Sequence, residues 1–367
     1  MNKNVKNITV IICFISIIFG FMVSNIIKTD RASSYSERRK LAEFPQISFE
    51  KLFSGDWFEE FEKYSLDQFV FRDGFRTIKA IGMFYLFYQN DNNGIYIVDG
   101  NISKIDYPLN EKSVINAAEK LNEVYEKYLQ GLKVYYSIIP DKNYFLAAEN
   151  GYLGIDYDIM QKIMDQNIEN MKYINLFDSL AIEDYYKTDI HWSQEKILKA
   201  TNKLLNELGS DIQIDESQYS RKELYPFYGS YYRQLALSIT PDKLIYMTND
   251  LLEKAEVYDY ESKTYSNVYM PDRFNGMDAY DVFLSGAKAL ITIENPESTA
   301  DRELILFRDS FGSSIAPLLL SSYSKITLVD LRYISTDLLG EFVEFSEKQD
   351  VLFLYNTQII NNSYMLK

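Results

Sequence analysis

The C-terminal part of the chain alternates short apolar runs with amphipathic segments, and this alternation constrains the fold more than any other feature. Strands are expected at 304–307, 326–330 and 351–355, with helices at 312–321 and 336–347 between them. This order is typical of a parallel sheet, because parallel strands need a long crossover connection, which is usually a helix. The sequence therefore predicts an α/β fold, with a parallel sheet and helices on both faces.

The same alternation begins near residue 110. Helices are expected at 110–129, 158–171 and 194–208, and strands at 134–139 and 173–176. Residues near 210–300 are less regular, with short strands expected at 244–247, 254–260, 268–270 and 290–293. We interpret this stretch as an insertion that carries substrate contacts, within an α/β domain spanning 91–367.

An uncharged apolar run extends from Ile8 to Ile27 and is long enough to cross a bilayer as a helix of about 20 residues. A cleaved signal peptide would have a shorter run and a better cleavage site than Val23-Ser24-Asn25. We therefore expect residues 1–28 to form a cytoplasmic tip and an uncleaved transmembrane anchor. Basic residues flank both sides, so the positive-inside rule does not fix the orientation.

Residues 29–90 are expected to form a polar juxtamembrane spacer followed by a largely helical segment from Leu52 to Tyr88. A turn at Gly94 then precedes a short strand at 95–98. The acidic residues near this turn do not have the spacing of an EF-hand loop, so a hairpin is preferred to a calcium site.

Composition narrows the class of partner and the compartment. The formal net charge of −15 makes nucleic acid an unsuitable partner, because phosphate binding needs a basic face. The only cysteine, Cys13, lies within the anchor, which suits an exported protein without disulfides. The chain is expected to be a single-pass cell-membrane protein with an extracytoplasmic catalytic domain.

The chain has one histidine, His191, in the sequence Thr188-Asp189-Ile190-His191-Trp192. In an extended segment, Asp189 and His191 project to the same side and can share a hydrogen bond. Ser193 is a suitable N-cap for the following helix, which would place the imidazole near the positive end of the helix dipole. A carboxylate that orients an imidazole is two-thirds of a catalytic triad.

The matching nucleophile is Ser310, in Arg308-Asp309-Ser310-Phe311-Gly312. An apolar strand runs into a turn there, and the first amides of the next helix can hold an oxyanion while Gly312 gives room for the turn. The G-x-S-x-G elbow is absent, because Arg308 stands two residues before the serine. Taken singly, Ser310 could be a helix cap and His191 a packing residue, so their joint occurrence carries the prediction.

These motifs resemble those of the DHHW protein family, which is similar to alginate O-acetylation proteins with an SGNH-hydrolase-like fold. The similar blocks cover nearly the whole exported part and include Glu37 to Pro45, Gly55 to Phe58, Asp67 to Asp73, Gly229 to Arg233 and Val329 to Tyr333. The resemblance implies Ser310 as nucleophile, His191 as base and Asp189 as its orienter in a flavodoxin-like fold. The Asp-His pair precedes the serine, opposite to the order in ordinary SGNH hydrolases.

The function expected from this pattern is O-acyl transfer, with acetyl as the group, to a secreted or cell-wall polysaccharide through an acyl-serine. The resemblance implies a membrane-embedded acyltransferase partner that supplies acetyl groups. An O-acetyl esterase with the same triad and a non-catalytic glycan-binding or assembly protein remain alternatives. No cofactor or metal is expected. Arg332 and Tyr232 are predicted substrate contacts, and Asn143 and Gly229 are candidates for the oxyanion hole.

Overall fold

The computed structural model describes residues 3–34, 37, 39–298 and 300–367. Arg38 of the first family-like block, and residues 1 and 2 of the expected cytoplasmic tip, lie outside the described residues. The chain divides into two compact units: Met1–Asn92 with Arg233–Ser238, and Asn93–Tyr232 with Ile239–Lys367.

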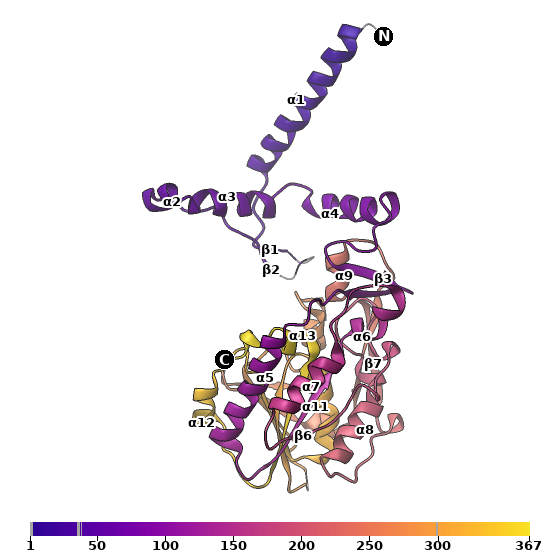
Figure 1. The fold of residues 1–367 in the computed structure, drawn as a ribbon, viewed down its shortest axis with the longest axis vertical. Helices are drawn as coiled ribbons and strands as arrows, with labels where there is room; N and C mark the ends of the chain where they lie inside the picture. Colours follow the sequence, from indigo (N-terminus) through magenta and orange to yellow (C-terminus); the bar gives the residue numbers. More distant parts are fainter. Residues whose placement is uncertain (1–2, 35–36, 38, 299) are drawn as a thin grey trace. The chain divides into compact units, whose positions relative to one another are not determined.

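The first unit is helical, as the sequence predicts (Figure 1). Its elements are α1 (Lys3–Ile27), β1 (Ser33–Ser34), β2 (Arg39–Lys40), α2 (Phe49–Ser54), α3 (Asp56–Asp67), α4 (Arg72–Ile81) and a π-helical turn at Gly82–Leu86. Ser48 caps α2 through the Lys51 amide, and Gly55 ends it with a φ of 92°, a conformation that glycine adopts without strain. Helix α1 is the one helix in the described part of the chain that is long and apolar enough to span a membrane.

The second unit contains an eight-stranded sheet in the order β10-β9-β11-β13-β12-β14-β5-β6. These strands are β5 (Lys133–Ile139), β6 (Lys172–Tyr173), β9 (Glu256–Asp259), β10 (Thr264–Asn267), β11 (Leu290–Glu294), β12 (Glu303–Arg308), β13 (Lys325–Val329) and β14 (Gln349–Asn356). The neighbours from β13 to β6 pair in parallel, whereas β11, β9 and β10 form an antiparallel edge. The predicted α/β class is confirmed, and the sheet is mixed because the insertion supplies its antiparallel strands.

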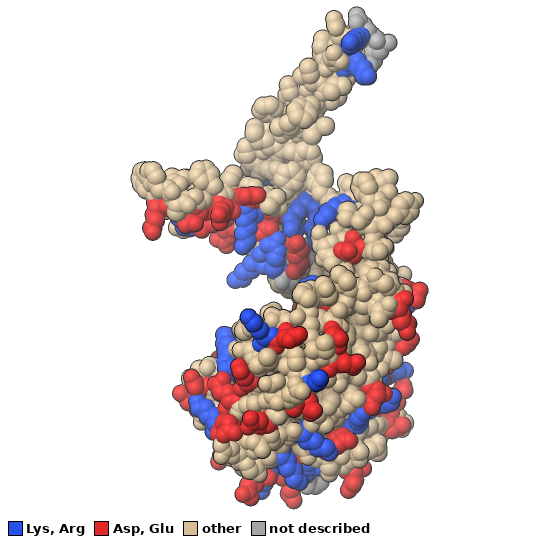
Figure 2. All heavy atoms as spheres, viewed as in Figure 1, with Lys and Arg blue, Asp and Glu red and all other residues tan. Residues whose placement is uncertain are grey.

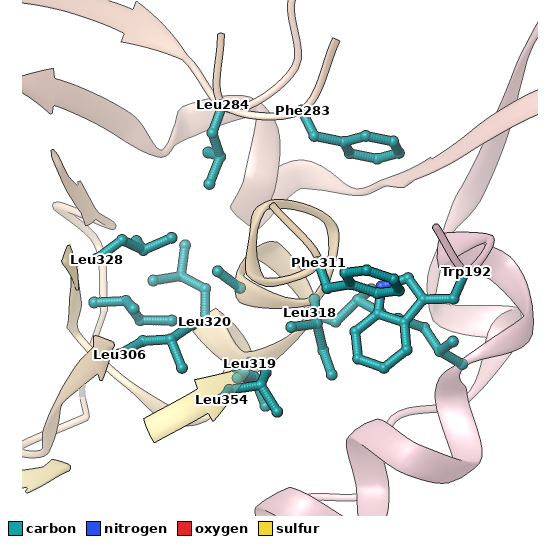
Figure 3. Close-up of a cluster of buried hydrophobic side chains, with 14 of the residues drawn as sticks. Trp192, Phe283, Leu284, Leu306, Phe311, Leu318, Leu319, Leu320, Leu328 and Leu354 are labelled. Carbon is teal, nitrogen blue, oxygen red and sulfur yellow. The ribbon is translucent and has the colours of Figure 1, made fainter. Parts of the chain in front are cut away.

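Helices cover both faces of this sheet. The helices of this unit are α5 (Glu111–Val124), α6 (Lys142–Leu146), α7 (Tyr157–Asn167), α8 (Leu198–Glu207), α10 (Asp250–Lys254), α11 (Gly312–Leu319), α12 (Leu339–Phe342) and α13 (Thr357–Asn361). The boundary between the two units falls within α9 (Ser230–Leu235). Alternate residues of β12 face opposite layers: Leu306 packs in the core that contains α8 and α11, and Phe307 in the core that contains α5 and α7. Figure 3 shows the first of these cores.

Two antiparallel hairpins complete the second unit. They are β3 (Ile95–Val98) with β4 (Asn101–Lys104), and β7 (Ser220–Phe227) with β8 (Asp242–Thr248). The first is the hairpin expected near Gly94, and the second belongs to the insertion. Asn110 caps α5 through the Ser113 amide, as its position before the helix suggests.

Several predicted elements differ from those observed. The helix expected at 158–171 ends at Asn167, and the strand expected at 173–176 is observed at Lys172–Tyr173. Residues 268–270 make only an isolated bridge, at Tyr269 with Phe283, because Pro271 follows at once and begins a 3-10 turn. The predicted helix at 336–347 ends at Phe342, and Phe345 instead stacks on Tyr128. The helix expected to begin at 194 starts as a 3-10 turn, Gln194–Lys196, and α8 begins only at Leu198.

Candidate active site

Ser310 lies where β12 passes into α11, at the carboxyl end of a strand inside the parallel part of the sheet. Asp309 holds this turn in place: its two carboxylate oxygens accept hydrogen bonds from the amides of Phe311 (2.9 Å) and Asn356 (2.7 Å). Burial raises the pKa of this carboxyl group. The Ser310 side chain does not cap α11, so its hydroxyl is left for another partner.

That partner is the chain's only imidazole. The Ser310 hydroxyl oxygen lies 2.7 Å from His191 Nε2, and His191 Nδ1 lies 2.5 Å from Asp189 Oδ1. Asp189 is fully buried and His191 nearly so, whereas Ser310 is partly exposed. With Nδ1–H donating to the carboxylate, Nε2 is the nitrogen that can accept the serine proton. The structure therefore brings the three predicted triad residues into one hydrogen-bonded series.

The Asp-x-His segment is a turn and not the extended stretch expected from the sequence. Asp189 Oδ1 also accepts the His191 backbone N–H, at 3.0 Å, so the aspartate closes a short loop on itself. Aspartate favours this geometry because its side chain reaches the amide two residues on. Ser193 makes no side-chain cap to the following 3-10 turn, so the predicted helix-dipole effect on His191 lacks its structural basis.

Gly229 lies against the backbone that carries the aspartate. A Cβ atom on Gly229 would lie 2.4 Å from both Asp189 Cβ and the Thr188 carbonyl oxygen, a separation that real Cβ atoms do not adopt. The next amide, Ser230 N–H, donates to Asp189 Oδ2 at 2.5 Å, and the Gly229 amide donates to Thr188 Oγ1 at 3.1 Å. Gly229 therefore positions Asp189, in contrast to the oxyanion-hole role considered from the sequence.

Two opposite charges hold the loop that precedes the histidine. The ammonium group of Lys142 is buried and donates to the carbonyl oxygens of Tyr186 (2.8 Å), Lys187 (2.9 Å) and Asp189 (3.3 Å). On the amide side, Asp242 accepts from Lys187 N–H (3.1 Å) and from Thr188 N–H (2.7 Å). Burial lowers the pKa of Lys142 to about 7.

The imidazole is also held by an aromatic shelf. The rings of His191 and Tyr280 stack with centroids 3.8 Å apart and planes 6° apart. The Tyr280 hydroxyl donates to Ser314 Oγ at 2.8 Å, and Trp192 Nε1 donates to the same oxygen at 2.8 Å. Trp192 further meets Phe311 edge to face, as the neighbouring rings in Figure 3 show.

A buried charge cluster lies behind the nucleophile. Asp330 accepts two hydrogen bonds from the Arg332 guanidinium, at 2.8 and 2.6 Å, and lies 3.7 Å from Arg308. Arg308 is fully buried, and burial lowers its pKa. Its Nε and Nη2 atoms have no hydrogen-bond partner among the residues that the structure describes. Gly312 allows this arrangement, because a Cβ atom there would lie 2.5 Å from Arg308 Cβ.

The remaining predicted contacts are used inside the fold. The Arg332 guanidinium donates both of its hydrogen bonds described above to Asp330. Both polar atoms of the Asn143 side chain are hydrogen-bonded: Oδ1 accepts from the Tyr96 hydroxyl (2.7 Å) and Nδ2 donates to the Leu153 carbonyl (3.2 Å). The Tyr232 amide donates to the Thr188 carbonyl at 2.9 Å, and its partly exposed ring stacks on Tyr228.

The helix amides after Ser310 are not the oxyanion donors that the sequence suggested. The N–H groups of Phe311, Gly312 and Ser313 already donate to Asp309 Oδ1, the Asp309 carbonyl and the Ser310 carbonyl. These bonds close the turn at the start of α11. Within the described residues, the amide of Ser310 itself has no acceptor, so it is the donor that this turn leaves available.

Sequence reasoning missed Lys142, Asp242 and Tyr280. Lys142 carried a weak signal, since it stands just after the buried strand at 134–139, on the edge where parallel sheets place their sites. Asp242 and Tyr280 belong to the irregular insertion, where no periodicity indicated which residues reach the site.

The sheet and the hydrogen-bonded Ser-His-Asp series together define an α/β protein with a candidate serine site. The chain belongs to the DHHW protein family, whose profile matches residues 146–329. Comparison with curated protein sequences gives no match.

Solved structures with similar folds include a DHHW family protein from Eubacterium siraeum, with a TM-score of 0.62 and 21% identity over 75% of this chain and 94% of that chain. Bacillus cereus PatB1 has a TM-score of 0.60 and 19% identity, over 73% and 97% of the two chains. PatB1 with a sulfonyl adduct is a further match, with a TM-score of 0.58 and 17% identity, over 72% and 97%. At these identities the similarity shows the fold.

Proposed function

We propose that this protein is a membrane-anchored, extracytoplasmic O-acyltransferase that moves an acyl group, with acetyl as the natural choice, onto a secreted or cell-wall polysaccharide. The observation that carries the proposal is the unbroken series from Ser310 Oγ through His191 to Asp189, with separations of 2.7 and 2.5 Å. Residues arranged in this way activate a serine for acyl chemistry on unrelated folds.

In the first half-reaction, His191 Nε2 takes the proton of the Ser310 hydroxyl as Oγ attacks the carbonyl carbon of an acyl ester or thioester. The tetrahedral oxyanion accepts a hydrogen bond from the Ser310 amide. When the intermediate collapses, the bond to the leaving group breaks and His191 returns its proton to that group. Asp189 stabilises the imidazolium throughout and keeps the ring oriented.

In the second half-reaction, a sugar hydroxyl replaces the departed group. His191 removes its proton, the sugar oxygen attacks the acyl carbon, and the ester bond to Ser310 breaks as the imidazolium protonates Oγ. The serine and imidazole are thereby restored. The same steps with water in place of the sugar describe an O-acetyl esterase, so the choice of acceptor separates the two activities.

The anchor and the family resemblance support the cellular setting of the proposal. Helix α1 contains 25 residues, none of them buried, as expected for a helix that lies in lipid. A membrane-embedded acyltransferase would supply acetyl groups from inside the cell, and this chain would transfer them outside.

The test is turnover of an activated acetyl ester by the full chain in detergent micelles. We expect a burst equal to the active-site concentration, followed by slow hydrolysis, and loss of both phases in Ser310→Ala. Oligosaccharides from the cell envelope of the same organism are then added. A transferase should pass the acetyl group to the sugar, whereas an esterase should release free acetate at an unchanged rate. Absence of any burst in the wild-type chain would instead support a non-catalytic glycan-binding protein.

A further inference from the structure

The helices of the first unit carry an exposed apolar surface that the proposed chemistry does not use. The side chains of this surface lie on α2, α3, α4 and the following π-helical turn, and include Phe49, Phe53, Phe58, Phe71, Ile78 and Tyr85. Phe53 is 88% exposed and Ile78 is 64% exposed. Soluble surfaces rarely leave so many large apolar groups together, and such a patch marks an interaction site.

The opposite side of these helices is charged and internally paired. Arg39 binds Asp67, and Arg72 lies 2.7 Å from Glu37. Figure 2 shows the charged groups near α2 and α3 gathered along one side of these two helices, with the other side free of charge. Each helix is therefore amphipathic. Phe75 of α4 packs on Phe21 and Phe69, whereas the side chains of the exposed apolar surface remain open to solvent.

The attachment of α1 indicates what covers this surface. Phe21 stacks on Phe69, with ring centroids 5.6 Å apart, and Asn25 Oδ1 accepts the Val70 amide at 2.7 Å. These contacts fix α3 and α4 crosswise to α1, as Figure 1 shows. The 14 uncharged residues from Asn7 to Gly20 remain for the hydrocarbon core and span about 21 Å, and the long side chains of Lys3 and Lys6 can reach from the next turn to the opposite headgroups.

An apolar cavity lies at the same junction. It has a volume of about 730 Å³ and is lined by Met22 and Ile26 of α1 and by Phe44, Phe61 and Phe69, with Lys28 among the polar residues. Its lining also includes the polar side chains of Asn25, Asp30, Tyr64, Ser65 and Gln68. Met22 and Ile26 belong to α1, the helix that is proposed to lie in lipid.

We propose that α2, α3 and α4 form a platform that lies flat on the extracytoplasmic leaflet of the membrane. Its exposed apolar surface is buried at the boundary between the lipid headgroups and the acyl chains. The partner is the bilayer that α1 crosses. Aromatic side chains are enriched at this depth, and amphipathic helices bind there through their apolar stripe. The inference rests on the proposed anchoring by α1 and is independent of the proposed chemistry.

The test uses nitroxide labels and power-saturation EPR on the full chain in vesicles of phosphatidylcholine and phosphatidylglycerol. A label on the native Cys13 first reports the depth of α1. In a Cys13→Ser background, Phe53→Cys and Ile78→Cys probe the apolar surface, and Lys63→Cys on the charged side of α3 is the matched control. We expect the labels at 53 and 78 to be more accessible to oxygen than to an aqueous nickel chelate, and the reverse at 63.

Each other outcome overturns the inference. Labels at 53 and 78 that match the control at 63, while Cys13 lies deep, would place the platform in water. Labels shielded from both reagents would mean that a protein surface covers the helices. If the label on Cys13 is accessible to the nickel chelate, α1 does not lie in the membrane, and both the proposed anchor and the proposed platform are wrong. Ester turnover measured on the same samples reports the proposed function separately, because no labelled residue lies at the active site.

Discussion

The imidazole of His191 lies face to face on the phenol ring of Tyr280, with centroids 3.8 Å apart. A ring in this position restricts the imidazole to one plane and favours the imidazolium that forms when the serine proton is taken, because a cation is attracted to an aromatic face. Tyr280 lies in a 3-10 turn, Ala279–Val282, within the irregular stretch near 210–300. It does not come from the parallel sheet. The irregular stretch near 210–300 therefore supplies the ring that holds the proposed base.

Replacing this ring tests its role in the chemistry. Tyr280→Leu should lower kcat/KM for an activated acetyl ester by roughly 3- to 30-fold, the range that corresponds to the loss of one cation–π contact. Tyr280→Phe keeps the ring and loses only the hydrogen bond to Ser314, so its kcat/KM should stay within about threefold while its stability falls by about 1 kcal/mol. Equal rates for the two variants would contradict the stacking role.

Gly229 should be intolerant of a methyl group. Gly229→Ala would place Cβ 2.4 Å from Asp189 Cβ, so the aspartate must move away from the imidazole. We expect kcat to fall by about 100-fold, the usual effect of displacing a catalytic group by an ångström. Gly74→Ala is the control, since nothing lies within 4 Å of its added Cβ, and its kcat should equal that of the wild type. Full activity in Gly229→Ala would show that the close approach is unimportant.

Lys142 gives the stability a pH dependence of known sign. Its pKa is about 7 in the folded chain against 10.5 for an ordinary lysine, because burial disfavours the charge. Below pH 7 both states hold the proton, and folding bears the full penalty of burying it. Between pH 7 and 10.5 only the unfolded chain keeps the proton, so the stability of the wild type rises with pH, by up to about 1.4 kcal/mol per unit.

Lys142→Met lacks this titration, and urea unfolding on both sides of pH 7 measures the difference. The wild type should gain stability relative to the variant as the pH rises. If the difference in free energy of unfolding between the two proteins stays constant with pH, or if the variant gains stability relative to the wild type as the pH rises, the lowered pKa of Lys142 is ruled out. The variant should also lose activity at every pH, because the carbonyls of Tyr186, Lys187 and Asp189 lose their shared donor.

The two arginines near Asp330 should differ in their importance. Arg332→Met removes the bidentate partner of a fully buried carboxylate and should lower the free energy of unfolding by about 3–5 kcal/mol. Arg308→Met removes a buried guanidinium with two unpaired nitrogens and leaves Asp330 bonded, so its loss should be below about 1 kcal/mol. Thermal and urea unfolding measure both, and the reverse order of stability would contradict this account of the cluster.

The sequence predicted the parts of this molecule that depend on local pattern. The strand–helix alternation gave the layers, and the two-residue spacing of Asp189 and His191 gave their hydrogen bond. The proximity of Ser310 to His191 joins residues 119 positions apart, and its prediction rested on the joint occurrence of the two motifs and on the family resemblance. Local pattern could not give the strand order, because β14 is last in the chain yet pairs between β12 and β5.

The other misses share a physical cause. Lys142 acts on backbone carbonyls and Tyr280 on a ring face, and neither contact restricts residue type at a fixed spacing along the chain. Gly229 was noticed, but its tight contact with Asp189 is visible only in three dimensions. Contacts of this kind are set by packing between distant segments, and periodicity does not encode them.

Peptide mapping by mass spectrometry after brief exposure to an activated acetyl ester tests the central claim most directly. The wild-type chain should carry one acetyl group on Ser310, and His191→Ala should carry none in the same time, because the chain has no second imidazole to take the proton. Acetylation of Ser310 at an unchanged rate in His191→Ala, or an acetyl group on another residue in its place, would contradict the proposed triad.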